Sequence, residues 1–319
     1  MTFAPVALFV YNRPAHTRRT LESLSANAEA RETELFIYAD AAKPGATGEE
    51  RENVRQVRSV IRERAWCGRV TITEMETNRG LAASIIRGVR EVLARSGSAI
   101  VLEDDLHLAS TFLSYMNSAL RCYENDQEVM HVSGYMFPVA EELPETFFLR
   151  LTSSWGWATW RRAFDQFEPD AGKLLAQLRE RDLLETFNLE GAYDFAAQLE
   201  ANASGRLHTW AAQWYATLLL KDGLGLFPRR SLVENFGFDG SGVHCQDHDK
   251  RFAGSAATGG IRVTHSKLGE SEAARRAVRR FLREPLSTRW RQGLHRCWAK
   301  FRGAAEAKPT RGLSAKLHD

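Results

Sequence analysis

The chain has 319 residues, of which 44% are hydrophobic and 26% charged, and its formal net charge is +3. These values are ordinary for a soluble globular protein, and the length suits one large α/β domain, alone or with a helical appendage. No stretch approaches the ~18 uninterrupted apolar residues of a membrane span. The four cysteines are scattered, which excludes a disulfide framework and a cysteine-based metal site.

The first half of the chain alternates apolar runs with segments of helical spacing. Continuous apolar runs predict buried strands over Val6–Tyr11, Leu35–Ala39, Val70–Met75 and Ala99–Leu102. Helical spacing predicts helices between them, over His16–Leu24, Glu49–Arg64 and Leu81–Ala94. Strands separated by helices of ~10–15 residues form βαβ units. The predicted fold class is therefore α/β, with a Rossmann-like, mostly parallel, doubly wound sheet flanked by helices.

Polar residues follow each of the four predicted strands. Open parallel sheets bind ligands at the carboxyl ends of their strands, because loops from different strands converge there. That edge would bring together Asn12–Arg13, Asp40, Asn78–Gly80 and Glu103–Asp105. The sequence therefore predicts a ligand-binding site at this edge.

The acidic triplet Glu103, Asp104 and Asp105 is the strongest indication of a functional site in the sequence. Three adjacent carboxylates at the end of a buried strand repel one another and need a counter-charge. A hard cation such as Mn²⁺ or Mg²⁺ supplies that charge and bridges a carboxylate to phosphate oxygens. A solvated acidic turn is the competing interpretation.

Four other residues at the same edge are candidates for substrate contact. Asp40 offers acceptors to a base or a ribose hydroxyl, and Arg13 offers a guanidinium to a diphosphate. Asn78 and Arg79 open a predicted helix, whose N-terminal N–H groups suit an anion. Turn formation and helix capping are the alternative explanations for these residues.

The second half of the chain is less regular. Strands are predicted over Met130–Ser133 and Phe147–Leu151, and helices over Phe112–Tyr123, Leu174–Thr186, Ala192–Ala201 and Ala211–Lys221. Two further stretches carry candidate site residues.

The first of these stretches holds three tryptophans within six positions and includes Trp155, Gly156 and Trp157. An indole ring there would either stack on a sugar ring or pack in the core. The second is the glycine-rich loop Phe236–His244, which contains Asp239 and ends on His244, a candidate ligand to a metal or phosphate.

Several short motifs occur in order between about residue 5 and residue 246. They are Tyr11–Pro14 with Arg18–Leu21, Leu102–Leu106 with Phe112–Tyr115, Val132–Gly134, Gly156–Trp157, Glu168–Pro169 and Phe236–His244. In this order they resemble N-acetylglucosaminyltransferase I and bacterial family 2-like glycosyltransferases. The resemblance implies the GT-A fold, a nucleotide-diphosphate sugar donor with UDP favoured, and an inverting transfer of a hexose or N-acetylhexosamine.

The same resemblance implies roles for individual residues. Asp105 would ligate Mn²⁺ or Mg²⁺, while Glu103 and Asp104 would contact the donor. Arg13 and Asp40 would hold the nucleotide. A bound metal neutralises the charge that builds on a departing diphosphate, which agrees with these assignments.

An inverting transferase also needs a general base for the acceptor hydroxyl. The family tends to place an Asp beside a Trp after its Gly-Trp motif, but the corresponding segment here, Thr209–Trp214, contains no acid. Asp239 is the candidate base, with Asp165 a weaker one. The missing acid keeps open a catalytically inactive nucleotide- or sugar-binding module. A nucleotidyltransferase of the same fold is a further alternative, for which Asn12–Ala15 is a poor triphosphate loop.

The predicted organisation is a GT-A domain over residues 1–265, with a nucleotide-binding half (1–110) and an acceptor-binding half (111–265), and a basic helical tail over 266–319. From Arg275 to Arg302 the tail holds ten Arg or Lys residues and one acid. Basic residues with interleaved aromatics suit an anionic bilayer surface, and no recognition motif favours nucleic acid. We expect a cytoplasmic protein, peripheral to the inner membrane through this tail, that acts on a glycan or lipid-linked saccharide acceptor.

Overall fold

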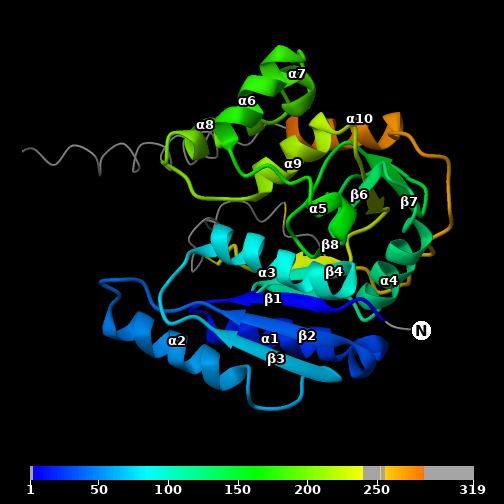
Figure 1. Cartoon of the computed structure of the whole chain (residues 1–319). Helices are drawn as coiled ribbons and strands as arrows, with labels where there is room; N and C mark the ends of the chain where they lie inside the picture. The colour runs from blue at the N-terminus through cyan, green and yellow to red at the C-terminus, as the bar shows by residue number, and fades with distance from the viewer. Residues whose placement is uncertain (1–2, 240–251, 253–255, 284–319) are drawn as a thin grey trace, which may run out of the picture. The chain divides into compact units, whose positions relative to one another are not determined.

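A computed structural model describes residues 3–239, 252 and 256–283, which belong to a compact unit ending at Arg283. An eight-stranded sheet forms its centre, in the order β3-β2-β1-β4-β8-β6-β9-β7 (Figure 1). The strands are β1 (Val6–Val10), β2 (Glu34–Ala39), β3 (Arg69–Glu74), β4 (Ser98–Glu103), β6 (Val129–Ser133), β7 (Thr146–Leu149), β8 (Trp157–Trp160) and β9 (Leu224–Pro228). A separate ribbon pairs β5 (Leu106–Leu108) antiparallel with β10 (Val233–Asn235).

The sheet is mixed but mostly parallel. Strands β3, β2, β1 and β4 are parallel neighbours, and β6 is parallel to β9. Strand β8 is antiparallel to both β4 and β6, and β7 is antiparallel to β9. The predicted fold class, an α/β fold with a mostly parallel sheet flanked by helices, is confirmed. Strands β5, β8, β9 and β10 were not among the predicted strands.

The helices begin and end where local chemistry favours it. Helix α1 has Pro14 in its first turn, where a missing N–H costs nothing. Helix α2 opens with a reciprocal capping box between Thr47 and Glu50, and α3 ends on Gly97 at φ +76°. The helical elements are α1 (Pro14–Ser25), η1 (Ala28–Glu32), α2 (Gly48–Val60), α3 (Leu81–Ser96), α4 (Phe112–Cys122), α5 (Arg161–Phe164), α6 (Ala171–Glu180), α7 (Leu184–Phe187), α8 (Phe195–Ala203), α9 (Ala211–Leu220) and α10 (Glu272–Arg283).

One predicted helix, Leu174–Thr186, is two helices in the structure. Helix α6 ends at Glu180, and Asp182 then takes a left-handed conformation with φ of 53°. That backbone conformation cannot continue a right-handed helix, so the chain turns before α7.

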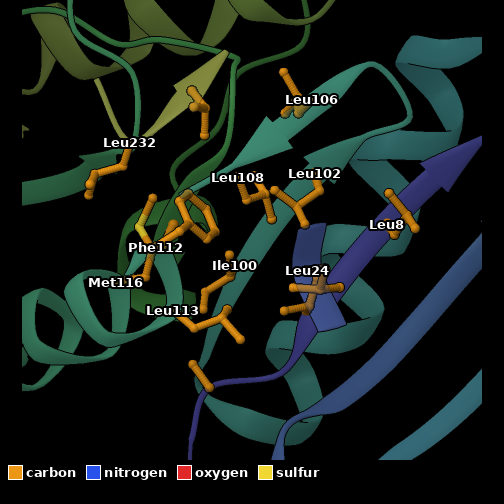
Figure 2. Close-up of a cluster of buried hydrophobic side chains, with 14 of the residues drawn as sticks. Leu8, Leu24, Ile100, Leu102, Leu106, Leu108, Phe112, Leu113, Met116 and Leu232 are labelled. Atoms are coloured by element: carbon orange, nitrogen blue, oxygen red, sulfur yellow. The ribbon is translucent and has the colours of Figure 1, made fainter. Parts of the chain in front are cut away.

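Alternate residues along the central strands face two different helical layers. Leu8 of β1 belongs to a core shared with α1, α2 and α4, which Figure 2 shows in part. The neighbouring Phe9 faces α3 instead and stacks on Tyr38 at 5.1 Å between ring centroids. The side chains labelled in the first core are Leu8, Leu24, Ile100, Leu102, Leu106, Leu108, Phe112, Leu113, Met116 and Leu232.

Helix α10 belongs to the same compact unit as the sheet, and this unit extends beyond the predicted domain boundary at 265/266 to Arg283. Arg275 is buried and forms ion pairs with Glu190 and with Glu270, the latter at 3.0 Å. Arg279 forms an ion pair with Glu190 at 2.8 Å. The apolar face of α10 joins a second core through Ala274, Val278, Phe281 and Leu282.

These contacts change the interpretation of the basic tail. Arg275 and Arg279 are held by acids of the same unit, so they are not a free basic surface. Residues 284–319, which the predicted basic tail also includes, lie outside the described part of the chain. Within the described residues, no helix is long and apolar enough to cross a membrane.

Candidate functional site

The three acids of the triplet lie where a parallel strand ends. Glu103 is the last residue of β4, opposite Phe9 of β1, and Asp104 and Asp105 form the turn into β5. Because β1 and β4 are parallel neighbours, the segment after β1 emerges at the same edge. The predicted meeting of Arg13 with the acids follows from this pairing.

Arg13 bridges two of the three carboxylates. Its Nη2 contacts Asp104 Oδ1 and lies 3.0 Å from Asp105 Oδ2. The backbone N–H of Tyr11 also donates to Asp104 Oδ2, at 3.4 Å. Both aspartates are largely buried, so a guanidinium that reaches both is a strong local counter-charge.

The electrostatics of the cluster reflect three carboxylates facing one guanidinium. Burial, together with the charges of Asp105 and Asp104, raises the pKa of Glu103 to about 8. Burial also raises the pKa of Asp104, although Arg13 opposes this shift. Burial lowers the pKa of Arg13, but the two aspartates outweigh it and leave that pKa raised. Negative charge therefore remains only partly compensated at this edge.

The glycine-rich segment after β10 packs directly on the triplet. The backbone N–H of Phe236 donates to the carbonyl oxygen of Asp105 at 3.0 Å, and the N–H of Gly237 donates to Asn235 Oδ1 at 2.8 Å. A Cβ atom at Gly237 would lie 3.0 Å from Asp105 Cγ and closer still to Oδ2. Only glycine fits here, and sequence spacing alone could not reveal this contact.

The candidate base Asp239 lies two residues beyond Gly237. Its Oδ2 is 3.1 Å from His16 Nε2 of α1, and the Asp239 side chain is 49% exposed. The ring of His16 also packs against the ring of Phe236. The guanidinium of Arg19 lies over the Phe236 ring, with its Cζ atom 4.0 Å from the ring centroid. The loop that bears Asp239 is thus anchored to both α1 and the acid triplet.

Asp40 connects two loops at the same edge of the sheet. Its carboxylate accepts backbone N–H groups from Ala41 at 2.9 Å, Arg79 at 3.0 Å and Gly80 at 3.0 Å. Asn78 donates its side-chain amide to the carbonyl oxygen of Ala41 at 2.7 Å. Asp40 and Asn78 therefore tie the loop after β2 to the loop before α3, which matches the turn-forming alternative.

The two tryptophans predicted to contact substrate have different environments. Trp157 is fully buried in β8 and stacks on Trp210 at 5.0 Å between ring centroids, so it is a core residue and cannot stack on a sugar. Gly156 is also enclosed, since a Cβ there would lie 2.9 Å from a methyl group of Val233. Trp157 and Gly156 are therefore both enclosed by protein, while Trp155 is half-buried and lines a cavity.

That cavity, of about 290 Å³, borders the glycine-rich segment through Phe238. Its walls come from the segments after β6 and β7, from α8 with the residues before it, and from the start of α9. The aromatic residues Tyr135 and Tyr193 line it together with Gln198, and none of these was a sequence candidate. They are separated by up to 63 positions, and no local pattern marks them.

A divalent cation fits the chemistry of the triplet, which offers hard oxygen donors and incompletely balanced negative charge. Among the described residues, no group of three His, Cys, Asp or Glu side chains converges into a full ligand set. A cation held there would need the remaining ligands from a diphosphate or water. His244, the second candidate metal ligand, lies outside the described residues.

No protein-family model and no curated protein matches this chain. Solved structures give distant matches. TarS of S. aureus has a TM-score of 0.31 and 13% identity over 56% of this chain, and the chain covers only 30% of TarS. Mouse xyloside xylosyltransferase 1 in its apo form has a TM-score of 0.37 and 12% identity, covering 68% of this chain and 81% of that one.

A UDP-glucose pyrophosphorylase complexed with UDP-glucose gives a TM-score of 0.34 with 10% identity, covering 70% of this chain and 90% of that one. These TM-scores are too low for the activities of those proteins to be transferred. The functional argument therefore depends on the residues of the site itself.

Proposed function

We propose that this protein is a metal-dependent inverting glycosyltransferase that moves a hexose or N-acetylhexosamine from a nucleoside-diphosphate donor, with UDP favoured, to a glycan or lipid-linked acceptor. The observation that carries the proposal is the cluster of Glu103, Asp104 and Asp105 at the end of β4, with Arg13 bridging two of its carboxylates. Three acids at a ligand-binding edge cost free energy unless a cationic ligand compensates them.

In this proposal, different residues of the site bind different parts of the donor. Asp105 is the proposed metal ligand, and Glu103 and Asp104 face the nucleotide and sugar. A bound Mn²⁺ or Mg²⁺ would supply Lewis-acid stabilisation of the departing diphosphate. Arg13 lies within reach of the same carboxylates and offers donors to phosphate oxygens.

Deprotonation of the acceptor is assigned to Asp239. The start of α9 supplies alanines, Ala211 and Ala212, to the cavity, and no Asp or Glu is among the described residues that line it. Asp239 directly follows Phe238, which does line the cavity, and its carboxylate is half exposed. It therefore immediately follows the two residues, Gly237 and Phe238, that contact the acid triplet and the cavity.

The proposal is tested by calorimetric titration of UDP with and without Mn²⁺, together with an assay of donor hydrolysis. We expect UDP binding that depends on Mn²⁺ and is lost in Asp105→Asn. The matched control is Asp182→Asn, since Asp182 lies in a distant turn at a left-handed φ that asparagine tolerates. The proposal is contradicted if UDP binds equally well without Mn²⁺, or if the Asp105→Asn variant still binds UDP.

A catalytically inactive nucleotide-binding module is the second candidate. It is favoured by one observation, the absence of an acid among the described residues that line the cavity beside α9. Metal-dependent nucleotide binding without hydrolysis of any donor, and without transfer to any acceptor, would support it. Release of pyrophosphate from UTP and a sugar 1-phosphate would instead indicate a nucleotidyltransferase.

A further inference from the structure

The aromatic cavity beside the glycine-rich segment has the composition of a carbohydrate subsite. Trp155 forms one wall, with the ring of Tyr135 edge-on to it at 4.5 Å and that of Phe238 edge-on at 5.6 Å between centroids. Edge-to-face neighbours hold an aromatic ring in a fixed orientation. Trp155 is nevertheless half-buried rather than enclosed, so part of its surface stays accessible.

Polar groups accompany these rings. Three consecutive hydroxyl residues, Thr152–Ser154, line the cavity, and Gln198 donates its amide to the hydroxyl of Tyr193 at 3.1 Å. Tyr193 is one of two large apolar side chains counted as exposed among the described residues, at 36%. A pocket for a purely hydrocarbon chain would not need these hydroxyl and amide groups.

No charged side chain is found among the described residues that line the cavity. An anionic ring, such as a uronic acid or a sugar phosphate, would lose its hydration there without gaining a cationic partner. An uncharged sugar loses less, because its hydroxyl groups find partners and its C–H face packs on an indole. The lining therefore selects for a neutral ring.

We propose that this cavity binds one uncharged pyranose ring of the acceptor, with Trp155 as the stacking platform. This inference rests on the proposed glycosyltransferase function, because the cavity and the acid triplet share one connecting segment. Gly237 packs on Asp105, and the next residue, Phe238, lines the cavity. Because these two residues are consecutive, a sugar ring bound in the cavity would lie next to the proposed donor site.

Room for the ring depends on small side chains at the start of α9. Ala211 is half-buried and lines the cavity, and a larger side chain at this position would occupy its volume. A cavity of about 290 Å³ is close to the lower end of the range of ~300–1,000 Å³ for ligand pockets. One ring, rather than a long oligosaccharide, matches that size.

The test is saturation-transfer NMR on the full chain with methyl glycosides of glucose, galactose and N-acetylglucosamine, alongside methyl glucuronide and geraniol. We expect at least one neutral glycoside to bind, and the uronate and the prenyl alcohol not to bind. Trp155→Ala should weaken binding about five-fold, equivalent to ~1 kcal/mol, while Trp155→Phe keeps most of it. Ala211→Leu should abolish binding by filling the cavity.

The matched control for Ala211→Leu is Ala94→Leu, on an exposed position of α3, which should bind like the wild type. The proposal is overturned if no neutral glycoside binds, if glucuronide or geraniol binds as well, or if Trp155→Ala and Ala211→Leu leave binding unchanged. Metal-dependent UDP binding is measured on the same samples. If UDP binds but glycosides do not, only this inference fails, and if neither binds, the proposed function fails too.

Discussion

The backbone of Gly237 lies directly against the carboxylate of Asp105, with no room for a side chain between them. A Cβ atom at this position would be 3.0 Å from Asp105 Cγ. The contact joins residues that are 132 positions apart and sets where the proposed metal ligand can point.

Gly237→Ala is expected to weaken metal-dependent UDP binding about ten-fold, or ~1.4 kcal/mol, because the new methyl group must displace the Asp105 carboxylate. Calorimetric titration measures the change. Gly259→Ala is the control, since a Cβ at Gly259 meets nothing within 4 Å. Equal UDP affinity in both variants would show that Asp105 does not depend on this contact.

Arg13→Gln is expected to lower the free energy of unfolding by about 3 kcal/mol or more, because two buried aspartates lose their counter-charge. Mn²⁺ alone should then raise the melting temperature of this variant more than that of the wild type, since a cation replaces the missing charge. Thermal unfolding with and without Mn²⁺ tests both points. In Arg18→Gln, which breaks an exposed pair with Glu63, the Mn²⁺ effect should match the wild type. If the Arg13 and Arg18 variants respond alike to Mn²⁺, the acids do not attract the metal.

Trp157→Ala should cost about 3–5 kcal/mol of unfolding free energy, because it removes a fully buried ring packed against Trp210 and Trp214. Trp155→Phe, at a half-buried position, should cost much less. Urea unfolding of the two variants measures the difference. A larger loss for Trp155→Phe would reverse the assignment of core and cavity tryptophans.

His131 contributes stability that is lost on acidification, while Glu103, whose raised pKa favours the folded state at lower pH, acts in the opposite direction. Burial lowers the pKa of this histidine to about 3, and its ring nitrogens face two donors, Trp214 Nε1 and the N–H of Ser153, each at 3.2 Å. A neutral imidazole accepts a hydrogen bond from one of these donors, through its unprotonated nitrogen, and a protonated ring accepts from neither. Unfolded histidine titrates near ~6.5, so between that pH and about 3 the unfolded chain binds more protons, and the free energy of unfolding falls as pH falls.

Urea unfolding between pH 7 and pH 5 measures this slope. His131→Asn removes the contribution of the histidine, so acidification should lower the stability of this variant less than that of the wild type, whereas His208→Asn, at an exposed position, should respond to pH like the wild type. A slope that His131→Asn leaves intact would place the acid sensitivity in other groups.

A chain ending at Arg283 is expected to melt at the same temperature as the full chain, since the compact unit ends there. A chain ending at Gly269 should melt lower, because it loses α10, including the buried ion pairs of Arg275 and the apolar contact of Val278. Calorimetry of the three chains tests this boundary. Liposome pelleting of the same chains tests the predicted membrane contact of the tail over 266–319, for which the full chain should bind and the chain ending at Gly269 should not. Binding by the chain ending at Arg283 would move that role to α10.

Much of the proposed donor site could be predicted from the sequence by itself. Apolar runs such as Val6–Val10 must be buried on both faces, and strands alternating with helices form parallel neighbours. Parallel neighbours end at one edge, so Arg13 and the triplet beginning at Glu103 had to meet there. This part of the site follows from local patterns and one topological rule.

Only the tertiary structure decided the rest, because it depends on contacts between distant segments. Strand β8 lies antiparallel between β4 and β6, which places Trp157 in the core and leaves Trp155 at a cavity. The packing of Gly237 on Asp105 and the ion pairs of Arg275 likewise join segments far apart in the chain. The type and spacing of a residue indicate which contacts and reactions are open to it. Its burial and its contacting residues, which long-range packing sets, determine which of these it can perform.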